Sequence, residues 1–102
     1  MKVLIIEDEP LAAQHLKKLI LQYESHIEVV GMLDSISGSV DFLKKNQNPD
    51  LIFMDIQLAD GLSFSIFEQI KMESPVIFTT AFDEYAIKAF KFNSVDYLLK
   101  PL

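Results

Sequence analysis

Three short apolar segments of this chain each end on charged residues. The first segment runs into Glu7 and Asp8, the second runs into Asp55, and the third runs into Lys100. Short apolar runs that are bounded by turn residues are typical of strands buried on both faces of a parallel sheet. Because the carboxyl ends of parallel neighbours share one edge of a sheet, we expect three carboxylates and one ammonium to meet there.

The three carboxylates predict a site for a hard divalent cation. Glu7, Asp8 and Asp55 offer only oxygen, which suits Mg²⁺, Mn²⁺ or Ca²⁺ better than zinc. Clustered carboxylates repel one another unless a cation lies among them. Taken alone, the acidic pair could be a solvated helix start, since acidic residues favour helix N-termini. The coincidence of charged groups at three strand ends favours a site.

The other groups at this edge suit a phosphoryl group. Lys100 can face phosphoryl oxygens as a point charge, and Thr80 adds a hydroxyl donor at the end of the fourth predicted strand. A metal ion, an ammonium and a hydroxyl match a group whose negative charge spreads over its oxygens. The chain has no glycine-rich nucleotide cradle. The phosphoryl group must therefore arrive on another donor, and one of the carboxylates could accept it as an acyl phosphate.

Composition limits the class of protein. The 102 residues are enough for one domain, and half of them are hydrophobic, so the chain can bury a core. The net charge of −6 makes it a poor candidate for binding nucleic acid by itself. There is no cysteine, no signal-peptide pattern and no apolar stretch near the roughly 18 residues that span a membrane. These features fit a soluble, cytoplasmic protein.

Strand and helix patterns alternate along the chain. We predict strands at residues 2–6, 26–33, 50–54, 75–79 and 95–99, separated by helices at 9–24, 37–45, 61–73 and 84–92. Glu28 interrupts the second strand, which favours a place at the sheet edge. The first helix is expected to bury Ala12, Leu16, Leu19, Ile20 and Tyr23. This order predicts an α/β sheet with right-handed crossovers, in which ligands bind beyond the carboxyl ends of the strands.

These motifs resemble the receiver domains of two-component response regulators. The family's positions are matched, in order, by Glu7-Asp8, Asp55, Thr80-Ala81, Tyr97 and Lys100-Pro101. The stretches at 54–58, 80–90 and 95–101 resemble the LytTR-type (LytR/AlgR) subgroup, and the resemblance covers the whole chain. It implies a flavodoxin-like, doubly wound parallel sheet of five strands in the order 2-1-3-4-5.

The resemblance also implies a role for each charged residue. Asp55 would be the phosphoacceptor. Asp8 and Asp55 would hold Mg²⁺ together with the backbone carbonyl of Gln57, and Glu7, which stands where Asp is commoner in the family, would act through a metal-bound water. Lys100 would contact the phosphoryl oxygens.

Two further residues would form the switch. By the same resemblance, Thr80 would move its hydroxyl onto the phosphoryl group and Tyr97 would turn inward behind it. The domain would then have two states, and the charge of the phosphoryl group would shift the balance between them. The residues themselves leave alternatives open. Thr79 could present the inward hydroxyl instead, and Tyr97 could serve packing alone.

The function implied is a phosphorylation-dependent signalling switch rather than an enzyme with a separate substrate. A sensor histidine kinase would donate the phosphoryl group, and the domain would catalyse only its own phosphorylation and dephosphorylation. The changed surface would drive homodimerisation or release a transcriptional output domain that binds DNA. Family members carry one more helix after Lys-Pro, so we expect residues 1–102 to be a receiver fragment whose last helix and output domain lie outside this sequence.

Two other functions compete with this interpretation. A receiver-like interaction module would never take phosphate, but the full set of Asp8, Asp55, Thr80 and Lys100 speaks against it. A phosphohydrolase with an aspartate nucleophile needs an acid–base carboxylate two residues later, where this chain has Gln57.

Overall fold

Five parallel strands form the central sheet of the computed structural model, which describes residues 1–46, 48–81 and 94–100. The order across the sheet is β2-β1-β3-β6-β7. Numbered along the chain, these strands follow the order 2-1-3-4-5, so the predicted topology is confirmed. Their bounds are β1 (Lys2–Ile6), β2 (Glu28–Leu33), β3 (Leu51–Asp55), β6 (Val76–Thr80) and β7 (Ser94–Leu99).

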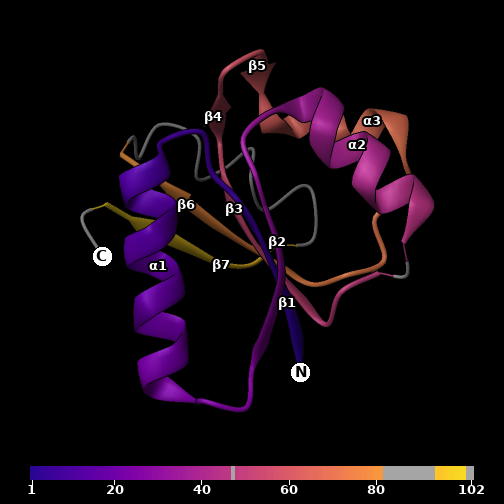
Figure 1. Cartoon of the computed structure of the whole chain (residues 1–102). Helices are drawn as coiled ribbons and strands as arrows, with labels where there is room; N and C mark the ends of the chain where they lie inside the picture. Colours follow the sequence, from indigo (N-terminus) through magenta and orange to yellow (C-terminus); the bar gives the residue numbers. More distant parts are fainter. Residues whose placement is uncertain (47, 82–93, 101–102) are drawn as a thin grey trace.

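Alternating side chains of the strands build a core on each face of the sheet. Val3 and Ile5 of β1 pack under α1 (Pro10–Tyr23), whereas Leu4 and Ile6 point to the opposite face, which is covered by α2 (Ile36–Lys45) and α3 (Ile66–Gln69). Figure 1 shows α1 on one side of the sheet and the two other helices on the opposite side. Because both faces are covered, the apolar strands read as continuous runs in the sequence.

Local signals set where the first two helices begin. Pro10 occupies the first turn of α1, where its missing N–H costs nothing. Ser35 precedes α2, and its Oγ accepts a hydrogen bond from the Gly38 N–H at 3.0 Å. The second strand begins at Glu28 rather than at residue 26, and β2 lies at the sheet edge as predicted.

The predicted helix over 61–73 is wrong. The chain instead forms a small antiparallel hairpin, β4 (Gln57–Leu58) and β5 (Gly61–Leu62), then a 3-10 turn (Ser63–Ser65) and the short α3, which ends at Gln69. The Ser63 N–H donates to the Ile56 carbonyl at 2.7 Å, and Gly61 has a φ of 139°. These tertiary contacts override the helical spacing of the apolar residues.

The predicted apolar face of the first helix is partly wrong. Leu16 and Ile20 are buried as predicted, and Ala13 is buried as well, but Tyr23, the last residue of α1, is 88% exposed. The predicted helix over 84–92 lies outside the described residues. Among the described residues, no helix has the length and apolar character needed to cross a bilayer.

Candidate functional site

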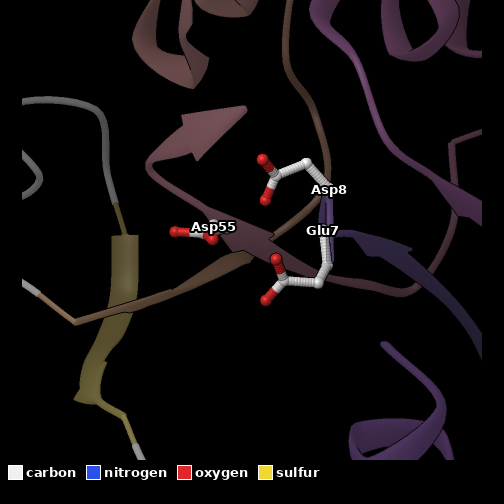
Figure 2. A group of neighbouring side chains, drawn as sticks. All are labelled: Glu7, Asp8 and Asp55. Carbon is white, nitrogen blue, oxygen red and sulfur yellow. The ribbon is translucent and has the colours of Figure 1, made fainter. Parts of the chain in front are cut away.

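The carboxyl ends of β1 and β3 bring three acidic side chains together. Ile6 lies opposite Met54 in the parallel ladder, so the residues that follow them, Glu7 and Asp55, emerge side by side. One carboxylate oxygen each of Glu7, Asp8 and Asp55 lies within 4.8 Å of the other two. Figure 2 shows the three carboxylates gathered around a common space. Glu7 and Asp55 are buried, whereas Asp8 is exposed to solvent.

Lys100 brings the fourth charged group to the same place. Its Nζ donates to Asp55 Oδ2 at 3.0 Å and also to Glu7 Oε1. The Lys100 N–H donates to the Thr80 carbonyl at 2.7 Å, which fixes the end of β7 beside the end of β6. Burial lowers the pKa of Lys100, but hydrogen bonds and attraction from Glu7 and Asp55 outweigh it, so the pKa is raised above its ordinary value. The ammonium therefore stays charged at neutral pH.

The site carries more negative than positive charge. Among the residues that the structure describes, three carboxylates and one ammonium meet here and leave a formal charge of −2. The pKa of Asp8 is raised, first because its neighbours partly desolvate the carboxylate and then because of a hydrogen bond and repulsion from Glu7, as expected for carboxylates that crowd one another. Oxygen-only donors with uncompensated charge fit a hard divalent cation such as Mg²⁺. The residues present therefore suit the metal that the sequence predicted.

Gln57 follows the acidic cluster at the start of β4. Its N–H donates to Asp55 Oδ1 at 3.3 Å, so the backbone turns back toward the buried carboxylate directly after β3. The Gln57 side chain is exposed. A part for the Gln57 carbonyl in metal binding remains a prediction, because the hydrogen bond places only the N–H.

Both threonines at the end of β6 are buried. Thr79 lies opposite Asp55 in the β3–β6 ladder, and it lines a hollow of about 370 Å³ together with Glu7 and Lys100. Thr80 holds the last position of β6, where its carbonyl accepts the hydrogen bond from Lys100. The choice of Thr80 as the hydroxyl that meets a phosphoryl group therefore remains a prediction.

Tyr97 occupies the middle of β7. It lies opposite Phe78 in the β6–β7 ladder and is half-buried against the core under α2 and α3. This contact accounts for the aromatic side chain by packing. The predicted inward turn of Tyr97 needs a second state of the domain and stays a prediction.

The sequence reasoning missed Asp60, which lies in the turn of the β4–β5 hairpin. Its carboxylate accepts hydrogen bonds from the Ile36 N–H at 2.7 Å and the Ser37 N–H at 3.2 Å, at the start of α2. These bonds lower the pKa of Asp60, and the bond from Ile36 contributes most. The signal that could have found the turn is the Asp60-Gly61 dipeptide, which is typical of tight hairpins.

The fold and the site together define a class of protein. The response regulator receiver domain model matches residues 3–102. The chain belongs to this family, and the resemblance predicted from its motifs is confirmed.

Particular relatives narrow the comparison. The sensory transduction protein LytT of Bacillus anthracis is 41% identical over 104 residues, which cover 99% of this chain and 42% of that protein. The transcriptional regulatory protein BtsR of Escherichia coli is 43% identical over 106 residues, with the same two shares. The chain thus spans less than half the length of these curated relatives.

A solved structure supports the fold directly. The crystal structure of the response regulatory domain of protein mrkE from Klebsiella pneumoniae matches with a TM-score of 0.84 and 40% sequence identity. The match covers 100% of this chain and 84% of that one. The flavodoxin-like receiver fold is therefore confirmed.

Proposed function

We propose that this chain is a phosphorylation-dependent switch of a two-component system, in which Asp55 accepts a phosphoryl group from a sensor histidine kinase. The observation that carries the proposal is the environment of the Asp55 carboxylate. Oδ2 receives a hydrogen bond from the Lys100 ammonium at 3.0 Å, and Oδ1 receives one from the Gln57 N–H at 3.3 Å. Glu7 and Asp8 place two more carboxylates within 4.8 Å. A buried nucleophile thus stands beside both a cation and a candidate metal site.

The side chains divide the chemistry between them. Asp8, Asp55 and the Gln57 carbonyl would hold Mg²⁺, with Glu7 acting through a bound water, and the ion would offset the charge of the phosphoryl oxygens. An Asp55 oxygen attacks the phosphorus, the new P–O bond forms, and the P–N bond to the histidine of the kinase breaks. Lys100 remains charged and turns its ammonium toward the phosphoryl oxygens.

The acyl phosphate adds negative charge where Asp55 and Glu7 now share one ammonium. The Lys100 ammonium must then share its hydrogen bonds between Glu7 and the new phosphoryl oxygens. Its backbone N–H is bonded to the Thr80 carbonyl, so a shift of Lys100 reaches the last residue of β6 directly. Thr80 and Tyr97 would respond and change the surface beside β7. In the longer protein, this surface would promote homodimerisation or free a transcriptional output domain that binds DNA in the cytoplasm.

Intact mass measurement tests the proposal. The chain is incubated with Mg²⁺ and a small acyl-phosphate donor, alongside Asp55→Asn and, as a matched control, Asp50→Asn. Asp50 is an exposed carboxylate that accepts a hydrogen bond from the Lys2 N–H, away from the acidic cluster. We expect one phosphoryl adduct on the wild type and on Asp50→Asn, and none on Asp55→Asn. Equal adducts on all three chains would contradict the proposal, and no adduct on any of them would favour an interaction module.

A further inference from the structure

A carboxylate of the β4–β5 hairpin binds the first turn of α2. Asp60 Oδ1 accepts the Ile36 N–H at 2.7 Å, and Oδ2 accepts the Ser37 N–H at 3.2 Å. The first N–H groups of a helix have no partner inside the helix, so a carboxylate there is favourable. Ser35 already caps the same end locally through the Gly38 N–H. Asp60 therefore adds a link between two segments that lie more than 20 residues apart.

Close packing supports the same link. Gly61, the residue after Asp60, lies so near α2 that an added Cβ would be 3.2 Å from Ile36 Cδ1. Ile36 and Leu58 of β4 are both buried in the core cluster on this face of the sheet. Figure 1 shows the hairpin beside α2, beyond the end of the sheet. The position of the hairpin is thus set against the helix by both polar and apolar contacts.

The same hairpin carries the backbone that follows the phosphoacceptor. Asp60 stands only five residues after Asp55, and between them the Gln57 N–H reaches Asp55 Oδ1 at 3.3 Å. That distance is long for a hydrogen bond to a carboxylate, so small movements of β4 change its strength. The Ser63 N–H closes the segment by donating to the Ile56 carbonyl at 2.7 Å. A displacement at Asp60 therefore reaches the backbone of Gln57 through a short, hydrogen-bonded segment.

We propose that Asp60 is a positioning residue for the phosphoacceptor site. By binding the first turn of α2, it fixes the hairpin and so holds the Gln57 backbone in place for Asp55 and for Mg²⁺. This inference rests on the proposed function, because it assigns the Gln57 carbonyl to the metal. The coupling between the two sites is reciprocal. A ligand such as Mg²⁺ that stabilises the hairpin at the Asp55 site must therefore also stabilise the contacts of Asp60 with α2.

Binding of Mg²⁺ alone tests the inference without phosphorylation. The variants are Asp60→Ala, Asp60→Asn and the matched control Ser35→Ala, which weakens the same helix end without touching the hairpin. Amide NMR titration with Mg²⁺ gives the Kd from the signals of Gln57 and Ser63. We expect Asp60→Ala to raise the Kd about tenfold, as loss of an outer support of a metal site does. Asp60→Asn should recover part of this loss, and Ser35→Ala should leave the Kd within about twofold of wild type.

Several results would overturn the inference. One is an Asp60→Ala chain with the wild-type Kd for Mg²⁺; another is a Ser35→Ala chain that loses as much affinity. If Asp60→Ala does not fold, hydrogen exchange on the wild type decides, because Mg²⁺ should slow exchange of the Ile36 and Ser37 amides, and unchanged exchange there refutes the link. The proposed function fails separately, if the wild type binds Mg²⁺ but takes no phosphoryl group on Asp55.

Discussion

Replacing Lys100 by methionine removes the ammonium that is bonded to both buried carboxylates. Its Nζ lies 3.0 Å from Asp55 Oδ2 and also binds Glu7, and the side chains of these acids are only 9% and 4% exposed. At an effective dielectric constant of about 20, the contact with Asp55 corresponds to roughly 5 kcal/mol of Coulomb attraction. Methionine nearly keeps the length of the side chain, so the substitution chiefly removes the charge.

The net cost of Lys100→Met is smaller than this attraction. The substitution also ends the cost of burying an ammonium, and Lys100 keeps 22% of its side chain exposed to water. Breaking a buried ion pair costs about 3–5 kcal/mol, and partial exposure of Lys100 reduces this to about 2–3 kcal/mol of unfolding free energy without Mg²⁺. With saturating Mg²⁺ the loss should be clearly smaller, because the cation offsets the same carboxylates.

Urea unfolding with and without Mg²⁺ measures both values. Lys45→Met is the matched control, because its pair with Asp41 is exposed, at 71% and 64%, and such pairs contribute about 0–1 kcal/mol. The reasoning is refuted if Lys100→Met is as stable as the wild type without Mg²⁺. It is also refuted if the loss has the same size with saturating Mg²⁺.

Three further predictions concern the acidic cluster and the hairpin. Asp8→Asn should raise the Tm without Mg²⁺, because partial desolvation and Glu7 both disfavour the charge of Asp8. The same substitution should abolish the Tm increase that Mg²⁺ gives the wild type. Thermal unfolding with and without Mg²⁺ checks both effects, and an unchanged Mg²⁺ effect would contradict the prediction. Gly61→Ala should lower the free energy of unfolding by about 1–2 kcal/mol, because φ is +139° and the new Cβ would press on Ile36; an unchanged urea midpoint would count against it. The hydrogen bond from Ile36 lowers the pKa of Asp60, so its contribution to stability is present above the unfolded-state pKa of about 3.9 and is lost as pH falls through the lower folded-state pKa. The Tm difference between wild type and Asp60→Asn should therefore hold at neutral pH and shrink below about pH 4, and a difference that persists in stronger acid would argue for another cause.

The sheet and the acidic cluster were predictable because their signals are local. The neighbouring strands β1 and β3 are short apolar runs, and each run leads directly into a carboxylate, so parallel pairing alone brings Glu7 and Asp55 together. The meeting of Lys100 with both also follows from strand ends that share one edge. No knowledge of loop structure was needed for this part of the site.

The segment after Asp55 could not be predicted by the same reasoning. Its apolar spacing suits a helix, but Asp60 binds α2 and Phe64 enters the core, and both contacts depend on residues far away in the sequence. The structure does not decide between the hydroxyls of Thr79 and Thr80 either, for a different reason. The sheet is covered on both faces, so both threonines are buried, and alternation along the strand does not single out one hydroxyl.

Chemical mapping of the phosphorylated residue tests the central claim most directly. After treatment with an acyl-phosphate donor and Mg²⁺, borohydride reduction converts a phosphorylated aspartate into homoserine, and peptide mass spectrometry identifies the position. The account predicts homoserine at Asp55 alone, with none when Mg²⁺ is removed by a chelator. Homoserine at Asp8 instead, or no homoserine at any aspartate of a folded chain, would contradict it.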